Sequence, residues 1–240
     1  EIVKKAWPMM KRYVDYLSGM AENNILSHGL GDWYDLGPKF PGEAQLTPKN
    51  VTATSIYYYD LRLLSMMAEL INNNEDATFY GKLAEDVRKS FNQKFLNPAI
   101  RVYSTGSQTA YSMPLYFEMV DDSIKQDVVD NLVNAINENN KALTAGDIGY
   151  RYLLRVLEQE GYSQLIYEMN SRDDIPGYGF QLAKGATALT ESWPALKYVS
   201  NNHLMLGHLM EWFYSGLAGI RQAPGSTGYE NIIIAPEIIG

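Results

Sequence analysis

The stretch KGATALTESWPALKYVSNNHLMLGHLMEWFYSGLAGI covers residues 184–220 and combines a glycine turn, a lone acid and an apolar repeat. Glu191 and Trp193 follow the turn, and the polar residues 200–203 (Ser-Asn-Asn-His) come next. From residue 204 to 220 apolar side chains recur at helical spacing, which predicts a helix. A carboxylate beside an aromatic ring and followed by Asn and His is typical of a sugar-binding cleft, because rings stack on the sugar while polar groups bind its hydroxyls.

The same residues also allow a purely structural interpretation. In that interpretation the glycine turn caps a helix, Glu191 is solvated and Trp193 is buried in the core. Residue types alone leave both possibilities open, so the rest of the chain has to be considered.

The overall composition is that of an acidic globular chain. Of the 240 residues, 46% are hydrophobic and 12% aromatic, which favours one or two domains with a packed core. The net charge of −8 argues against a nucleic-acid or anionic-membrane partner, since both need a basic face. No apolar run approaches the roughly 20 residues that span a bilayer.

Several kinds of site are disfavoured by what the sequence contains. There is no cysteine, so disulfides and thiolate chemistry are excluded while the redox compartment stays undecided. The three histidines, His28, His203 and His208, lack the HExxH-type spacing of zinc sites, and no EF-hand calcium loop occurs. We therefore expect neither a metal nor a cofactor.

Helical periodicity runs through most of the chain. It predicts helices over 2–22, 52–74, 76–95, 121–140, 150–160 and 163–169, with a further helix opening at 106–109. Glu75 or Asp76 is the expected cap of the third helix. Glycine-bounded polar turns lie at 29–37, 146–149 and 177–203, and residues 228–236 have the β-branched pattern of a strand. This alternation favours an all-α toroid of helical hairpins, with one set of loops around a central cleft.

Two polar segments outside residues 184–220 are ambiguous. The loop that carries Asp32, Trp33 and Asp35 is too polar for a core and too aromatic for a plain linker. Asp32 either faces a cleft or caps the local backbone. Gln108 either faces the same cleft or begins its helix.

The segments GATALTESW and SNNH-x4-GHLMEWFYSGLAGI together resemble the general-base region of the family 78 glycoside hydrolases, the α-L-rhamnosidases. That region reads roughly GATT-x-WE-x-W, then S-x-NH, then a helix ending in LAGI. The GDW segment at 31–33 is similar to a cleft loop of the same enzymes. The resemblance runs from about residue 1 to 237 and covers the later two-thirds of a catalytic barrel. It implies a partial (α/α)6 toroid over 1–225, incomplete on its N-terminal side, and the first strand of a β-sandwich over 226–240.

The resemblance also implies a reaction and a set of site residues. The expected activity is that of an inverting glycosidase that removes terminal L-rhamnose from rhamnosides, with Glu191 as the general base. The expected substrate-binding residues are Asp32, Trp33, Asp35, Trp193, Asn202 and His203. Asn202 and His203 would bind hydroxyls, and Trp33 and Trp193 would form hydrophobic walls. The general acid belongs to a motif upstream of the first helix that nothing in residues 1–240 resembles, so the isolated chain is expected to hydrolyse glycosides poorly or not at all.

Two departures and several alternatives qualify this interpretation. Thr190 and Ser192 stand where the family often has Trp and Arg or Asp, which puts the substrate preference in doubt. The alternatives are another toroid enzyme, such as an unsaturated uronyl hydrolase or a glycan phosphorylase, a non-catalytic sugar-binding relic, and a helical protein-interaction domain. A uronyl or phosphate substrate would favour Arg and Lys in the cleft turns, which contain few. Secretion or a periplasmic location of the full-length protein is plausible from the substrates of the family, although the chain shows no export signal.

Overall fold

The computed structural model describes all residues, 1–240, and most of the ordered chain is helical. The α-helices are α1 (Ile2–Met20), α2 (Lys49–Leu70), α3 (Asn74–Phe95), α4 (Gln108–Tyr116), α5 (Lys125–Glu138), α6 (Gly149–Gln159), α7 (Ser163–Ser171), α8 (Tyr178–Ala183) and α9 (Leu209–Trp212). A 3-10 turn η1 (Asp122–Ile124) precedes α5, and a π-helical turn η2 (Phe213–Leu217) follows α9. Two antiparallel hairpins pair β1 (Leu96–Asn97) with β2 (Val102–Tyr103), and β3 (Ile220–Gln222) with β4 (Ile232–Ile234).

The helices expected between residues 2 and 171 are confirmed, and side chains cap the starts of two of them, α3 and α4. Asn73, rather than Glu75 or Asp76, caps α3 by accepting a hydrogen bond from the backbone N–H of Asp76. Ser107 caps α4 in the same way, so Gln108 is its first residue. The two-residue strands β1 and β2 were not expected, because they are too short to show a periodic pattern.

The continuous helix expected over residues 204–220 is wrong. Only α9 and η2 are helical there, and Ile220 begins β3. A Cβ on Gly216 would lie 2.4 Å from the ring of Trp212, so the bare backbone lets the indole pack against the widened turn. Gly219 then takes a positive φ of 66°, which ends the helical segment and turns the chain into β3. Glycines at these two positions therefore override the apolar repeat.

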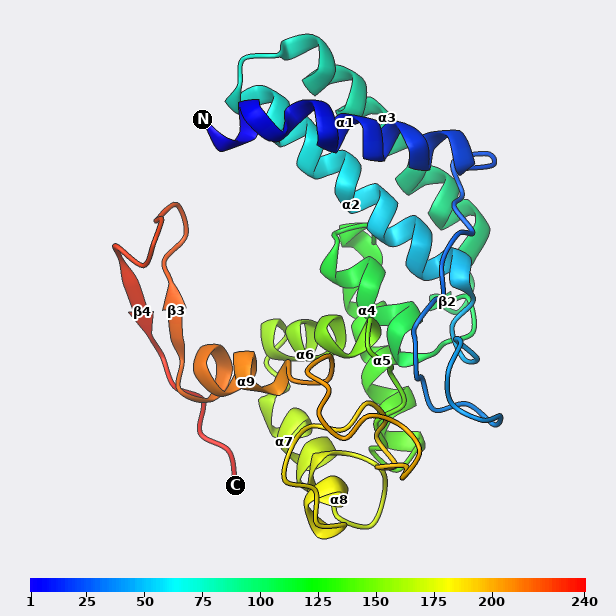
Figure 1. Ribbon diagram of the computed structural model, residues 1–240, viewed down its shortest axis with the longest axis vertical. Helices are drawn as coiled ribbons and strands as arrows, with labels where there is room; N and C mark the ends of the chain where they lie inside the picture. The colour runs from blue at the N-terminus through cyan, green and yellow to red at the C-terminus, as the bar shows by residue number, and fades with distance from the viewer.

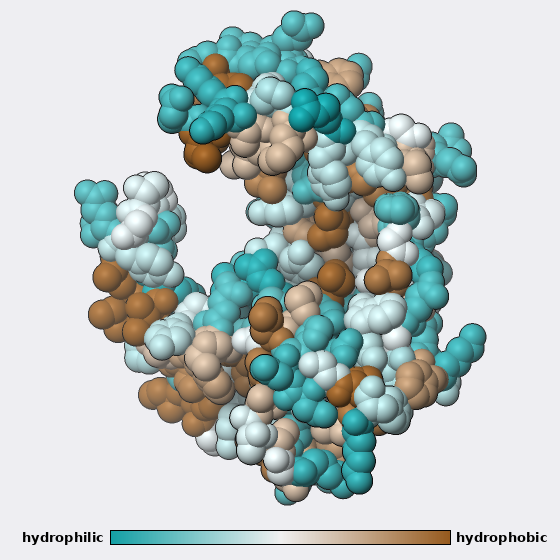
Figure 2. Space-filling view, in the orientation of Figure 1, coloured by the Kyte–Doolittle hydropathy of each residue, from teal (hydrophilic) through white to brown (hydrophobic).

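The helices follow one another in pairs around an open arc (Figure 1). Helices α2 and α3 pack together as an antiparallel pair, with α1 beside them, and α4 packs against both α5 and α6. The α1–α3 arm and the β3–β4 hairpin lie at the two ends of this arc. The space-filling view shows the inner side of the arc as a broad hollow with both polar and apolar residues on it (Figure 2).

Connections at the two ends of the helices differ in length. The long loops 21–48, 96–107, 139–148 and 172–208 form one end, which we name the loop end, and the short connections 71–73, 117–124 and 160–162 form the other, the turn end. Contacts between the long loops confirm that they meet. The hydroxyls of Thr47 and Ser107 are 2.6 Å apart, and the side-chain amide of Gln108 binds the backbone of Ala142 and Thr144. Gln108 thus joins two loops from a helix start.

The core is aromatic and runs through the helical part of the chain. The fully buried side chains include Trp193, Trp212, Tyr150 and Phe91. Two of these rings have a partner for their polar atom, since the indole N–H of Trp212 donates to the Ser163 hydroxyl and the Tyr150 O–H donates to Asn170. None of the helices combines the length and the apolar character that crossing a bilayer requires.

Phe91→Ala should destabilise the fold strongly. Phe91 is fully buried and lies 4.8 Å from Phe95 and 6.0 Å from Tyr103, measured between ring centroids. We expect the free energy of unfolding in urea to fall by about 3–5 kcal/mol, because the truncation leaves a cavity. Phe79→Ala is the matched control in the same helix, since that ring is 58% exposed, and should change stability by no more than about 0.5 kcal/mol. Similar losses for both variants would contradict this placement of α3.

Candidate functional site

The loop end brings the polar segments at 30–37, 145–149 and 189–203 into one place. The backbone N–H of Asp147 donates to the carbonyl of Trp33 at 2.8 Å. The indole N–H of Trp193 donates to the carbonyl of Ala145, also at 2.8 Å. Segments more than 100 residues apart in sequence are therefore in direct contact, as the toroid hypothesis requires.

Asp32 holds two of these segments together. Its carboxylate is completely buried and accepts hydrogen bonds from the Thr109 hydroxyl at 2.5 Å and from the N–H groups of Gly146 at 2.9 Å, Ile148 at 3.1 Å and Gly149 at 2.7 Å. Burial raises the pKa of Asp32 to about 6, against the opposing effect of these donors. Of the two roles open to Asp32 in the sequence, the structure places it in backbone capping, although across loops rather than locally.

Two glycines allow this close approach. A Cβ on Gly146 would lie 2.2 Å from the carbonyl oxygen of Trp33, and one on Gly149 would lie 1.9 Å from the Thr109 hydroxyl. Both distances are far inside van der Waals contact, so only glycine fits without moving a backbone or the Asp32 network. The glycines predicted as turn residues therefore serve loop-to-loop packing.

Asp35 and Trp193 are also buried in supporting positions. The Asp35 carboxylate accepts from the N–H groups of Gln45 at 2.9 Å and Leu46 at 2.7 Å, and burial raises its pKa. Trp193 is fully buried, with its ring edge-on to Tyr150 and Tyr178. Like Asp32, these two side chains present no surface to a ligand in this conformation, so their contact with a sugar stays a prediction.

Glu191 and His203 lie on one cross-linked segment, residues 189–203, which we name the strap. The N–H of Glu191 donates to the carbonyl of Ser200 at 2.9 Å, and the N–H of Ser200 donates to Oε2 of Glu191 at 3.1 Å. The N–H of His203 donates to the carbonyl of Leu189 at 2.9 Å. These bonds hold Glu191 half-buried, with one carboxylate oxygen free of hydrogen bonds within the chain.

Asp147 is a further acidic residue of the site that sequence reasoning missed. It is 4% exposed, its Oδ1 has no hydrogen-bond partner, and its Oδ2 lies 3.9 Å from Nε2 of His203. Burial, with the nearby charges of Asp32 and Glu191, raises the pKa of Asp147 to about 7. The pattern Gly-Asp occurs at both 31–32 and 146–147, and that repetition was the available signal.

Tyr34 belongs to the same part of the loop end. Burial, with the charges of Glu191 and Asp147, raises its pKa. The residue has a positive φ of 62°, and its N–H donates to the carbonyl of Gly42 at 2.7 Å. A left-handed backbone at a bulky residue is uncommon and is often found at functional sites.

The rim of the site carries aromatic and amide side chains. Trp33 is half-buried and packs edge-on to Tyr34 with 5.5 Å between ring centroids, while Asn202 is exposed. Phe40 and Tyr198, from two different loops, stack at 5.2 Å and are 66% and 64% exposed. Sequence reasoning missed this pair, because no local pattern links residues so far apart.

The charges at the site are almost all negative. His203 is the only basic side chain that forms an ion-pair contact with Asp147, and Glu191 has no such contact. An anionic uronyl or phosphate substrate needs a cationic partner, so the geometry favours a neutral ligand. No group of three His, Asp or Glu side chains is arranged to hold a metal ion.

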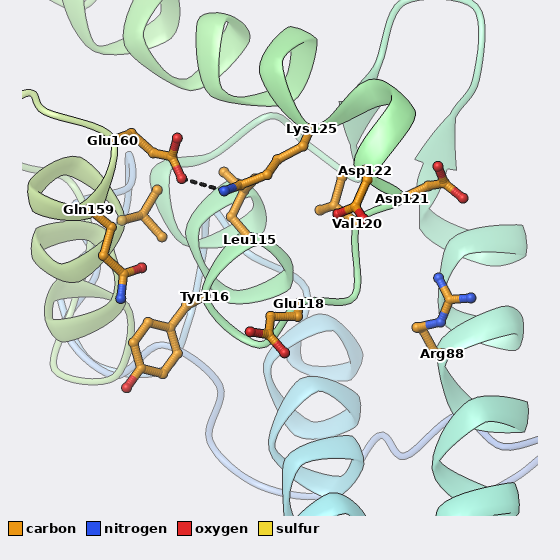
Figure 3. A pocket seen from close by; sticks show the side chains of 11 residues that line it. Arg88, Leu115, Tyr116, Glu118, Val120, Asp121, Asp122, Lys125, Gln159 and Glu160 are labelled. Atoms are coloured by element: carbon orange, nitrogen blue, oxygen red, sulfur yellow. Dashed lines mark ion pairs between the residues drawn. The ribbon is translucent and has the colours of Figure 1, made fainter. Parts of the chain in front are cut away.

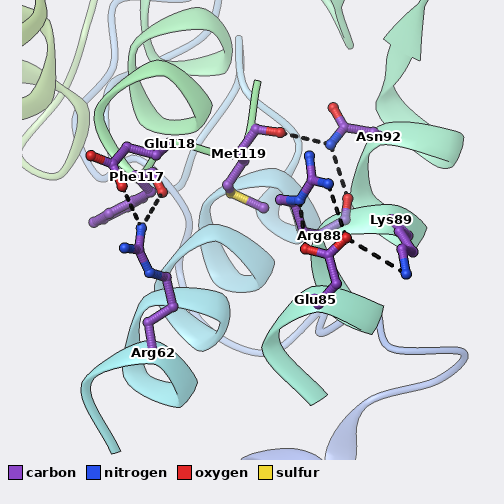
Figure 4. A network of polar contacts seen from close by, with 8 residues as sticks. All are labelled: Arg62, Glu85, Arg88, Lys89, Asn92, Phe117, Glu118 and Met119. Atoms are coloured by element: carbon purple, nitrogen blue, oxygen red, sulfur yellow. Dashed lines mark hydrogen bonds and ion pairs between the residues drawn. The ribbon is translucent and has the colours of Figure 1, made fainter. Parts of the chain in front are cut away.

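A cavity of about 650 Å³ lies at the turn end (Figure 3). Arg88, Glu118, Asp121 and Glu160 lie around it, and Lys125 pairs with Glu160 at 2.6 Å. An adjacent network ties the α2–α3 pair to the 117–121 turn (Figure 4). In it Arg62 pairs with Glu118 at 2.8 Å, and the Asn92 amide donates to the Met119 carbonyl at 2.8 Å. These contacts hold the turn end together.

The buried carboxyls of the loop end predict an unusual pH dependence of stability. The folded-state pKa values of Asp32 and Asp147 lie at about 6 and about 7, above the ordinary 3.8. The folded chain therefore binds more protons than the unfolded chain between about pH 4 and 7, so its free energy of unfolding should fall as pH rises through that window. Urea midpoints measured at intervals from about pH 5 to 7.5 check the sign.

Asp147→Asn should flatten this dependence, because it removes the group with the higher of the two pKa values. The exposed Asp173 is the matched control, and Asp173→Asn should leave the slope unchanged. A rise in the wild-type urea midpoint towards neutral pH would contradict the protonation assigned to these carboxyls.

Comparison with known proteins agrees with the geometry. The family model described as the bacterial alpha-L-rhamnosidase 6 hairpin glycosidase domain matches residues 1–217. An alpha-L-rhamnosidase of Streptomyces avermitilis is 28% identical over 98% of this chain and 23% of its own length. One from Formosa agariphila is 26% identical over 98% of this chain and 26% of its own length.

Solved structures give the same result. The alpha-L-rhamnosidase of Dictyoglumus thermophilum superposes with a TM-score of 0.91 at 30% identity, covering 100% of this chain and 27% of that one. The Streptomyces avermitilis enzyme complexed with L-rhamnose has a TM-score of 0.87 at 27% identity, covering 100% of this chain and 23% of that one. The chain thus spans about a quarter of the length of these relatives. The expected resemblance and the partial six-hairpin fold are confirmed, and the chain belongs to the bacterial alpha-L-rhamnosidase six-hairpin glycosidase domain family.

Proposed function

We propose that this chain is the part of an inverting α-L-rhamnosidase that supplies the general base, Glu191, and much of the site for a terminal L-rhamnose. The observation that carries the proposal is the position of Glu191. It lies half-buried at the loop end, where the N–H of Ser200 holds one of its oxygens at 3.1 Å and the other has no partner within the chain. A fixed carboxylate with one free oxygen suits a group that takes a proton from water.

The proposed step is direct displacement at the anomeric carbon. Glu191 removes a proton from a water molecule while that water attacks, and a carboxylic acid on the other side of the sugar protonates the departing oxygen. The two carboxyl groups of inverting glycosidases stand roughly 6.5–9.5 Å apart, which leaves room for the water. In this proposal the acid comes from a segment of the full-length protein outside the 240 residues.

Asp147 is not proposed as that acid, although it holds a proton up to about pH 7. An acid catalyst has to reach the glycosidic oxygen, and the Asp147 side chain is only 5% exposed beneath His203. Asp147 is therefore too buried to give its proton to a bound ligand.

Other residues contribute binding in the proposal. The amide of Asn202 and the ring of His203, which retains 29% exposure, would bind hydroxyls, and Trp33 would form an apolar wall. Asp32, Asp35 and Trp193 act beneath them by fixing the loops. The complex of the Streptomyces avermitilis relative with L-rhamnose supports rhamnose as the first ligand to test.

The proposal extends to the end of the chain. We propose that residues 1–225 are the partial catalytic barrel and that 226–240 begin a C-terminal β-sandwich. The three isoleucines of β4 are between 38% and 74% exposed on the β3–β4 hairpin, as expected of a strand that another sheet covers. Because β3 already begins at Ile220, the hairpin spans the proposed boundary.

Glu191→Gln tests the base by calorimetry with L-rhamnose on the 240-residue chain. We expect binding to be weaker by about tenfold or more, because a hydrogen bond to a charged group is typically worth about 1.5–3 kcal/mol. The exposed Glu230 is the matched control, and Glu230→Gln should bind like the wild type. Equal binding by all three proteins would favour a sugar-binding relic over an enzyme.

The isolated chain should hydrolyse an aryl α-L-rhamnoside very slowly. The loss of an acid catalyst typically removes about 10²–10⁴ of the rate. A fluorogenic or chromogenic rhamnoside assay, with a complete α-L-rhamnosidase as the positive control, measures the difference. Hydrolysis at the rate of the complete enzyme would show that both carboxyl groups lie within these residues and would overturn the proposal.

A further inference from the structure

Asp147 and His203 lie close together but do not form a hydrogen bond. Oδ1 of Asp147 and Nε2 of His203 are both buried without a hydrogen-bond partner, and Oδ2 of Asp147 lies 3.9 Å from Nε2. Buried polar atoms are nearly always paired, because leaving one unpaired costs about 1–3 kcal/mol. A water between the two groups would need a separation of roughly 4.4 Å or more, since each of its hydrogen bonds is about 2.8 Å long. A small side-chain rotation that joins the two groups directly is therefore the available solution.

Backbone hydrogen bonds hold both Asp147 and His203 in position. The backbone N–H of Asp147 donates to the Trp33 carbonyl, and the N–H of the neighbouring Gly146 donates to the Asp32 carboxylate. His203 is held by its N–H bond to the Leu189 carbonyl on the strap. Each backbone is therefore anchored on a different loop, so a bond between the side chains would join the 145–149 turn to the strap.

We propose that Asp147 is a positioning residue that binds Nε2 of His203 and thereby turns Nδ1 of the ring towards the loop-end site as a hydrogen-bond acceptor. The inference rests on the proposed sugar site and deepens it. A carboxylate that accepts from Nε2–H leaves a lone pair on Nδ1, which suits a sugar hydroxyl as donor. Nε2 is buried while 29% of the side-chain surface is exposed, so Nδ1 is the ring nitrogen left for a ligand.

Protonation of the pair reverses the polarity of that nitrogen. The titratable groups that face Asp147 are Asp32, Tyr34, Glu191 and His203, and burial with the charges of Asp32 and Glu191 raises its pKa to about 7. Above that pH the carboxylate accepts from Nε2–H. Below it, a carboxylic acid donates to Nε2, and Nδ1 then carries the proton and becomes a donor. Ligand affinity should therefore differ between about pH 6 and 8.

The test is the ring N–H signal of His203 in a proton NMR spectrum at about pH 8 and low temperature. A buried, hydrogen-bonded imidazole N–H exchanges slowly with water and gives a separate downfield signal. The chain has three histidines, so His203→Gln assigns the signal by removing it. Asp147→Asn should keep the signal, because the amide oxygen also accepts from Nε2–H, whereas Asp147→Leu has no acceptor and should lose it. Retention of the signal in a folded Asp147→Leu chain, or its absence from the wild type, would overturn the proposal.

A second measurement keeps the inference testable if the Leu variant does not fold. L-Rhamnose is titrated into the wild type and into Asp147→Asn at about pH 6 and 8. The carboxyl group of the wild type can change its protonation between these pH values, whereas the amide of the variant cannot. We expect several-fold pH dependence in the wild type and a smaller dependence in the Asn variant, and equal dependence in both would contradict the proposal. If no variant binds L-rhamnose, the proposed function fails, while the N–H signal still decides the Asp147–His203 bond.

Discussion

The buried Asp32 carboxylate is the interaction on which the loop end depends. Its two oxygens accept hydrogen bonds from the Thr109 hydroxyl and from three backbone N–H groups of the 146–149 turn. One side chain thereby joins the start of α4, the start of α6 and the 30–37 loop. A buried charge without these donors would be strongly unfavourable, so the carboxylate depends on the turn and its glycines, and the turn depends on the carboxylate. The same contacts bring Trp33 and Asp147, the neighbours of Asp32 and Gly146, close to each other.

The four carboxyl groups of the loop end differ in how deeply they are buried. Asp32 and Asp35 are the most buried and accept hydrogen bonds from protein groups. Asp147 is slightly more exposed, with Oδ1 unpaired and Oδ2 3.9 Å from Nε2 of His203, and Glu191 is half-buried with an oxygen unpaired within the chain. The deepest carboxyls are fully occupied as acceptors, so they shape the site rather than react. Only the outermost acid combines a fixed orientation with access to water, which is what a base requires.

Much of the helical architecture could be predicted from the sequence, because apolar residues recur at helical spacing along most of the helices. The region after residue 204 could not, since its apolar repeat is helical while Gly216 and Gly219 impose a wide turn and a strand. The family segments directed attention to Glu191 and the strap, whose role in binding or catalysis stays a prediction. The sequence left open whether Asp32 and Trp193 are buried or face a cleft, because the outcome depends on contacts with Thr109, Gly146 and Ala145 far away along the chain.

The unequal connections at the two ends of the helices also make the chain convenient for chemical labelling. The wild-type sequence has no thiol, so one cysteine introduced at an exposed residue of the turn end, such as Asp122, would be the only point of attachment for a fluorophore or a surface. Helix α4 separates that end from the loop end, and its 9 residues span about 13 Å at 1.5 Å per residue. A probe there would report on the fold and leave the loop end unobstructed.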